Sequence, residues 1–353
     1  MLHDKSKRRA QALCLAAMGE FDLIERYFKR PATRAALGVG DDCALLQPAP
    51  GTQLAISSDM LVENRHFFAD VDPATLGHKA LAVNLSDLAA CGAAPLAFTL
   101  ALALPRADEA WLAAFSSGLF ALADAHGCEL IGGDTTQGPL NICITVFGEV
   151  PVLNGKSRAL LRSGAKPGDD VYVSGTLGDA RLALDALRGM LALPSELALA
   201  LPPALLAQTR QRLEQPTPRV ALGQALRGVA TAALDLSDGL LGDLQHILKA
   251  SGVGATLDTS RVLELLAARQ HADWMPDLIS VEKQLECVLS GGDDYELAFT
   301  APPSAREAVL AASHLSATPV TRIGRIDAQP GLRLLDAQGL RLRGQFASFD
   351  HFA

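Results

Sequence analysis

The stretch KALAVNLSDLAACGAAPLAFTLALAL, residues 79–104, places a predicted helix directly before a predicted strand. Three leucines share one face at helical spacing: Leu81, Leu85 and Leu88. They predict a helix over residues 74–91. At 100° per residue, Asp87 lies roughly 120° round from this apolar stripe, on the rim of the buried face, where a carboxylate can reach a site. The apolar run at residues 96–104 predicts the strand that follows.

Helices and strands alternate on both sides of this stretch. Further helices are predicted over 20–30, 111–122, from 179 onward and over 239–250, and further strands over 54–56, up to 131, and over 142–147, 171–173, 232–236 and 296–299. Such alternation predicts a mixed α/β fold. At roughly 150 residues per domain, a chain of 353 residues corresponds to about two domains.

The expected domain boundary lies in residues 154–170, which are rich in Gly, Lys, Arg, Ser and Pro. We therefore predict an N-terminal domain over 19–153 and a C-terminal domain over 154–353. Residues 1–18 are expected to be an N-terminal extension, with disorder as one interpretation and a natural start at Met18 as another.

Composition and charge exclude several classes of protein. Apolar residues make up 49% of the chain, which disfavours a disordered or collagen-like protein. A formal net charge of -8 argues against a nucleic-acid-binding protein. The six cysteines form no C-x-x-C pair, which is typical of a reducing cytosol and predicts a cytoplasmic protein. Apolar runs such as residues 93–105 are too short for a membrane helix, so no membrane partner is expected.

Acidic residues recur where predicted strands end or glycines turn the chain. The clusters are Gly40-Asp41-Asp42, Ser57-Ser58-Asp59, Ser86-Asp87, Gly133-Asp134, Asp235-Leu236-Ser237-Asp238 and Asp293-Asp294. Carboxylates beside apolar runs need cations or backbone donors. Oxygen ligands of this kind suit Mg²⁺, which keeps substrate phosphates in its shell and can neutralise a polyphosphate.

Each cluster also has an ordinary structural interpretation. Asp after Gly is common in turns, and Asp or Ser before a helix is a common N-cap. Spacing alone leaves both interpretations open. Other nucleotide motifs fail, because Gly155-Lys156-Ser157 lacks the first glycine of a P-loop and Gly38-Val39-Gly40 lacks the third glycine of a dinucleotide fingerprint.

Taken in order, the motifs resemble the thiamine-monophosphate kinase family of the aminoimidazole-ribonucleotide-synthetase-like superfamily. The segments that carry the resemblance are Gly19-Glu20-Phe21, Gly38–Asp42, Lys79–Ala90, Gly132–Thr136, Arg162–Ala165, Asp235–Gly239 and Ser290–Glu296. The resemblance implies two α/β domains, the first dimerising through its strands. It also implies ATP-dependent phosphorylation of thiamine monophosphate to thiamine diphosphate, the last step of thiamine diphosphate biosynthesis.

The resemblance assigns roles to individual residues. Several Mg²⁺ ions are expected, with ligands at Asp42, Ser57, Ser58, Asp59, Asp87, Asp134, Asp235 and Asp238. ATP contacts are expected at Ser117, Gly133, Asp134, Arg162 and Ser237. Thiamine-phosphate contacts are expected at His66, Asp293 and Phe349. No residue is expected to act as a general base.

Three positions depart from the family pattern. Asp293 stands where Glu is usual, Ser58 where Thr is frequent, and Phe349 where Tyr or Trp is frequent.

Two other functions remain open. One is that of another ATP-using member of the superfamily, namely aminoimidazole ribonucleotide synthetase, formylglycinamidine ribonucleotide synthetase or selenophosphate synthetase. The other is a non-catalytic sensor of metal or thiamine phosphate.

Overall fold

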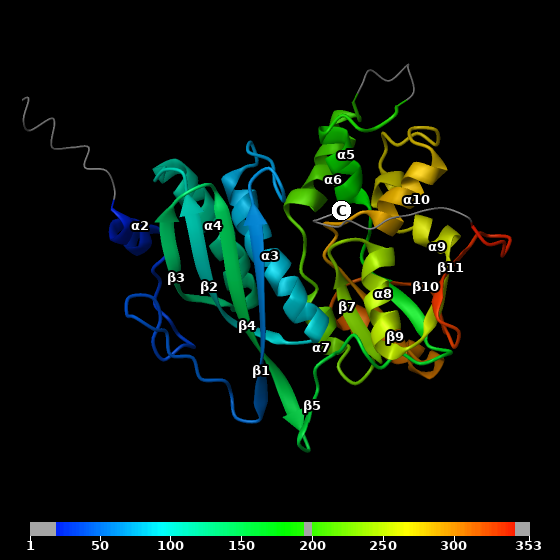
Figure 1. The fold of residues 1–353 in the computed structure, drawn as a ribbon, viewed down its shortest axis with the longest axis horizontal. Coiled ribbons are helices and arrows are strands. Elements are labelled where there is room, and N and C mark those ends of the chain that lie inside the picture. Colours follow the sequence, from blue (N-terminus) through cyan, green and yellow to red (C-terminus); the bar gives the residue numbers. More distant parts are fainter. Residues whose placement is uncertain (1–18, 194–199, 343–353) are drawn as a thin grey trace, which may run out of the picture.

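The helix predicted at 74–91 is α3, over Pro73–Cys91, in the computed structural model, which describes residues 19–193 and 200–342 (Figure 1). The Asp72 side chain accepts hydrogen bonds from the Ala74 and Thr75 N–H groups and so caps its first turn. Gly92, at φ 69°, ends it in the left-handed region. The predicted helix is confirmed, and its bounds agree with the prediction to within one residue.

The first sheet has the strand order β1-β4-β2-β3, and β5 pairs with β4. Its strands are β1 (Thr52–Val62), β2 (Ala94–Leu104), β3 (Glu129–Gln137), β4 (Asn141–Leu153) and β5 (Lys156–Ser157). Only β2 and β3 pair in parallel among these neighbours. The helices of this part are α2 (Glu20–Tyr27), α3 and α4 (Glu109–His126).

The second sheet has the order β11-β8-β10-β6-β9-β7. Its strands are β6 (Asp170–Ser174), β7 (Ala232–Leu236), β8 (Gly254–Asp258), β9 (Glu296–Ala301), β10 (Val320–Asp327) and β11 (Gly331–Leu335). Its helices are α5 (Asp179–Leu187), α6 (Pro203–Glu214), α7 (Val220–Ala225), α8 (Leu240–Ser251), α9 (Thr259–Leu263), α10 (Val281–Ser290) and α11 (Arg306–Leu315), with 3-10 turns η1 (Ala267–Gln270) and η2 (Pro303–Ala305). The mixed α/β fold is thereby confirmed. The domain boundary at 153/154 stays a prediction.

The molecule has two parts, one built on the first sheet with α2, α3 and α4 and one built on the second sheet with its helices. Helix α3 lies between the two parts and contacts both (Figure 1). It packs on α4 so closely that two glycines are required. A Cβ at Gly77 would lie 2.1 Å from the Phe115 carbonyl oxygen, and one at Gly118 would lie 1.8 Å from that of Ala74. On its other side α3 contacts β7 and α7. It is therefore buried on most of its surface, rather than along the single stripe expected from its leucines.

Two expectations about strand ends are wrong. Ser57, Ser58 and Asp59 lie inside β1, and Gly133 and Asp134 lie inside β3, because backbone pairing with β4 and β2 continues past the apolar runs. No strand is predicted at the position of β8, which pairs with both β10 and β11. No helix in the described ranges is both long and apolar enough to span a membrane.

Candidate active site

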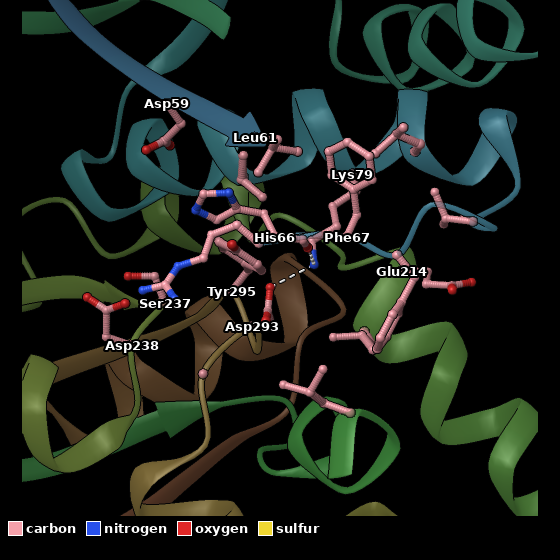
Figure 2. Close-up of a pocket in the computed structure, with 18 of the residues that line it drawn as sticks. Asp59, Leu61, His66, Phe67, Lys79, Glu214, Ser237, Asp238, Asp293 and Tyr295 are labelled. Atoms are coloured by element: carbon pink, nitrogen blue, oxygen red, sulfur yellow. Dashed lines mark hydrogen bonds and ion pairs between the residues drawn. The ribbon is translucent and has the colours of Figure 1, made fainter. Parts of the chain in front are cut away.

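A cavity of about 430 Å³ lies between the two parts of the molecule (Figure 2). Its walls come from β1, α3, the loop at 64–68, the end of β7, the turn at 292–295, and helices α5 and α6. Of the predicted site residues, those that line it are Asp59, His66, Asp87, Asp235, Ser237, Asp238 and Asp293. The fold thus brings together residues separated by more than 200 positions in the chain.

One end of the cavity is acidic. Asp59 faces α3 because its N–H donates to Asn84 Oδ1 at 3.1 Å. Asp87 accepts a short hydrogen bond from the Ser57 hydroxyl. The buried Asp235 accepts from Ser86 Oγ at 2.9 Å. Two adjacent residues of α3 therefore contribute to this end: Asp87 supplies a carboxylate, and Ser86 orients the carboxylate of Asp235 on β7.

These carboxylates raise one another's pKa values. Burial, followed by the charges of Asp87 and Asp238, raises the pKa of Asp59 to about 6. Burial, the Asp87 charge and nearby Asp243 raise the pKa of Asp235 to about 8. The pKa of Asp87 is also raised, chiefly by burial, although Ser57 and the Arg162 guanidinium oppose the shift. An acidic cluster that resists full ionisation is one that a cation would stabilise.

The donor set fits a hard cation, since every donor is an oxygen. Within residues 19–193 and 200–342, no group of three or more His, Cys, Asp and Glu side chains is close enough to enclose a metal ion. Mg²⁺ usually binds one or two carboxylates and fills its remaining positions with water and substrate phosphates. Separate carboxylates around a cavity suit that mode better than a closed protein cage.

The other end of the cavity is largely apolar, with an ion pair at its side. Its apolar residues include Leu61, Phe67, Val71, Leu76, Val83 and Leu213. The buried Lys79 ammonium lies 2.7 Å from Asp293 Oδ1, as the dashed line in Figure 2 shows. His66 Nδ1 accepts from the Val62 N–H at 2.9 Å, which leaves Nε2 to carry the ring proton. This end can receive a mainly apolar ring system with polar edges.

Other predicted residues do not line this cavity. Ser58 points to the opposite face of β1 from Ser57 and Asp59, because side chains alternate along a strand, and its hydroxyl lies 2.9 Å from Thr145 Oγ1. Four further residues are exposed elsewhere in the first part: Asp42, Ser117, Gly133 and Asp134. Arg162 is exposed but acts on the Asp87 charge. Phe349 lies outside the described residues, and all these roles stay predictions.

Three residues shape the site although the sequence predicts no role for them: Lys79, Asp243 and Tyr295. Lys79 and Asp87 are eight positions apart on α3, so helical spacing could have placed both on the cavity face. Asp243 accepts hydrogen bonds from the N–H groups of Ser237, Asp238 and Gly239 at 3.0, 3.0 and 3.1 Å. It fixes the loop that carries two predicted ligands. Tyr295 also lines the cavity, and no motif or spacing in the sequence predicts this position.

Comparison with known proteins gives the family. Residues 40–150 match the AIR synthase related protein N-terminal domain, and residues 166–337 match the corresponding C-terminal domain. Thiamine-monophosphate kinase of Salmonella typhimurium is 46% identical over 341 residues, which is 96% of this chain and 99% of that protein. The chain belongs to the thiamine-monophosphate kinase family.

Solved structures of the thiamine-monophosphate kinase family share the fold. The enzyme from Stenotrophomonas maltophilia K279a is 44% identical, with a TM-score of 0.75 over 88% of this chain and 94% of that one. AaThiL complexed with AMPPCP and TMP is 27% identical, with a TM-score of 0.68 over 87% and 89% of the two chains. The resemblance drawn from the motifs is therefore confirmed.

The stability of the metal-free protein is expected to depend on pH through the buried Asp235 carboxyl group. Asp235 keeps its proton up to about pH 8 when folded but loses it near 3.8 when unfolded. The folded state then binds more protons, so this group lowers the free energy of unfolding as pH rises through that window, by on the order of 1 kcal/mol per pH unit. We expect the melting temperature in EDTA to fall between pH 6 and 8 in the wild type.

The matched variant is Asp235→Asn, which keeps an acceptor for Ser86 Oγ. We expect its melting temperature to change less over the same pH range, because other titrating groups are common to both proteins. Differential scanning fluorimetry measures both curves. Parallel curves for the two proteins would show that Asp235 does not hold a proton in this range.

Proposed function

We propose that the chain transfers the γ-phosphoryl group of ATP to thiamine monophosphate, giving ADP and thiamine diphosphate. The observation that carries this is a single cavity with carboxylates at one end and apolar walls at the other. The first suits the cation-bound phosphates, and the second suits the thiamine rings. The family relatives are thiamine-monophosphate kinases, and one relative has been solved with AMPPCP and TMP.

The metal is proposed to be Mg²⁺, bound as several ions, each held by one or two of the carboxylates of Asp59, Asp87, Asp235 and Asp238 together with substrate phosphates. When bound, these ions would neutralise the negative charge of the two phosphate groups. The protein orients these carboxylates through Ser57, Ser86 and the backbone of the loop that Asp243 holds. The family position of Arg162, beside the Asp87 charge, supports a role on the nucleotide.

The reaction needs alignment more than proton transfer. A phosphate-ester oxygen with a second pKa near 6 is largely ionised at neutral pH, so no general base is required. That oxygen attacks the γ-phosphorus, a new P–O bond forms, and the bond to the β-phosphate oxygen breaks as ADP leaves. The protein holds the two substrates in line and neutralises their charges.

The deciding experiment incubates the purified protein with Mg-ATP and thiamine monophosphate and measures thiamine diphosphate by chromatography. Stoichiometric ADP and thiamine diphosphate support the proposal. ADP formed only with another acceptor supports a different ATP-using superfamily member. Binding of thiamine monophosphate without turnover supports a sensor.

We further propose that the chain acts in the cytoplasm. The five cysteines in the described ranges, Cys43, Cys91, Cys128, Cys143 and Cys287, are all free thiols, which is typical of a reducing compartment. Cell fractionation tests this proposal. Recovery of the native protein outside the cytoplasmic fraction would contradict it.

The chain is also proposed to form a homodimer through the outer face of the first sheet. On β1, alternate side chains point away from α3, and Ile56 and Met60 on that face are 60% and 52% exposed. Phe147 lies on the neighbouring strand β4, directly opposite Ile56. Exposed apolar residues in a row on a sheet face are typical of an interface.

Ile56→Lys is expected to give a monomer, because a charged side chain would be buried at the centre of this face. Light scattering after gel filtration should change from twice the chain mass of 37.1 kDa to that mass. Leu315→Lys is the control, since it alters an even more exposed apolar residue at the end of α11, away from the first sheet. A wild-type monomer, or a dimer that survives Ile56→Lys, would contradict the proposal.

A further inference from the structure

The turn at 293–295 has an unusual backbone. Asp293 has φ 65° and Tyr295 has φ 51°, both in the left-handed region. Asp tolerates this region, but a bulky aromatic residue rarely adopts it. Strained residues of this kind persist where the surrounding structure holds them, and they cluster at functional sites. Both residues line the cavity.

Several contacts hold this turn to the second part of the molecule. The Asp293 and Tyr295 N–H groups donate to the Ser237 and Leu236 carbonyl oxygens at 2.9 and 2.8 Å. Asp294, the residue between them, accepts from the Gly178 N–H at 2.9 Å. The turn is therefore attached to the strand and loop that carry the acidic end of the cavity.

Lys79 attaches the same turn to the first part of the molecule. Its side chain is 2% exposed, and its ammonium lies 2.7 Å from Asp293 Oδ1 and 3.4 Å from the His66 carbonyl oxygen. One buried charge thus contacts both segments in which the family pattern places thiamine-phosphate contacts, His66 and Asp293. Lys79 is the buried member of this pair and the Asp293 side chain is half-buried, so the loss of either charge leaves the other without its partner inside the cavity wall.

We infer that Lys79 is a positioning residue that sets the separation between the His66 loop and the Asp293 turn, and with it the fit of the acceptor substrate. This inference rests on the proposed function. Lys79 acts through Asp293 and the backbone of residue 66, at the apolar end of the cavity. Its loss is therefore expected to weaken acceptor binding far more than nucleotide binding.

Lys79→Met tests this, because it keeps most of the side-chain length and removes the charge. We expect the KM for thiamine monophosphate, and its calorimetric Kd, to rise at least about ten-fold. The loss of a charged hydrogen-bond partner of Asp293 corresponds to a change of that order in a binding constant. The KM for ATP should stay within about two-fold of wild type. A residue needed only for folding would not separate the two substrates in this way.

The double variant Lys79→Met/Asp293→Asn keeps the experiment decisive if Lys79→Met is unstable, because it leaves neither charge of the pair without its partner. We expect its affinity for thiamine monophosphate to be within about two-fold of that of the single variant Asp293→Asn, as for two groups acting as one pair. Arg306→Met is the control. It breaks an ion pair with the buried Asp170, away from this cavity, and should leave both KM values unchanged.

Three results would overturn the inference: an unchanged KM for thiamine monophosphate, equal rises in the KM for both substrates, or a fall in kcat with unchanged acceptor affinity. Turnover by the wild type separates this test from that of the proposed function. If the wild type makes no thiamine diphosphate, the proposed function fails, and calorimetry with thiamine monophosphate still measures whether Lys79 sets its affinity.

Discussion

Asp87→Asn should fold normally and lose most of its turnover. Asp87 lines the acidic end of the cavity and accepts a hydrogen bond from Ser57, which an amide oxygen can also accept. The substitution removes one negative charge that would hold Mg²⁺. Because a metal ion contributes several kcal/mol of charge stabilisation in the transition state, kcat should fall by about 100-fold or more.

Two further measurements define this result. The Mg²⁺ concentration that gives half-maximal activity should rise, since the site has lost a charge. The melting temperature without metal should hold or increase, because burial already raises the pKa of Asp87 and its charge is costly. The control is Asp124→Asn. Asp124 lies on α4, and its exposed carboxylate pairs with Arg30. Near-normal kcat with an unchanged Mg²⁺ dependence would remove Asp87 from the metal site.

Glu296→Gln should produce the largest loss of stability. Glu296 is fully buried at the start of β9 and is hydrogen-bonded by three side chains. Arg212 Nη2 lies 3.0 Å from Oε1, Arg219 Nε lies 2.6 Å from Oε2, and Ser174 Oγ donates to Oε2 at 2.6 Å. Gln removes the one carboxylate that both arginines contact directly, and breaking a buried ion pair costs about 3–5 kcal/mol.

Urea denaturation measures this loss as a fall in the free energy of unfolding. Glu25→Gln is the matched control, because Glu25 pairs with Lys29 on the surface of α2, and such pairs contribute about 0–1 kcal/mol. Equal effects in the two variants would show that the buried network around Glu296 contributes no more than a surface pair. The network also supports the site, since Arg212 donates to the Asp294 carbonyl oxygen at 3.2 Å.

Local signals predicted most elements around the site. Leucines at helical spacing predict α3, and the apolar run at 96–104 predicts most of β2. The same signals ended β1 too early, at residue 56. A strand continues wherever a neighbour pairs with its backbone, and polar side chains such as Ser57 and Asp59 do not stop that pairing.

The site was predicted unevenly for a related reason. The motifs predict Asp59, Asp87, Asp235 and Asp238 as site residues, and all four line the cavity. Lys79 belongs to the motif at residues 79–90, but its partner Asp293 lies 214 residues away, so no local pattern reveals the pair. The opposite orientations of Ser57 and Ser58 likewise appear only once β1 is known to run through both.

The sequence by itself determined the family, the mixed α/β class and the identity of the acids, because these depend on residue types and on order along the chain. Only the tertiary structure decided which acids share a cavity, how far burial raises their pKa values, and that Lys79 joins the two parts of the molecule. Those properties depend on distances between residues remote in the chain and on the water that folding excludes. Neither quantity is contained in local spacing.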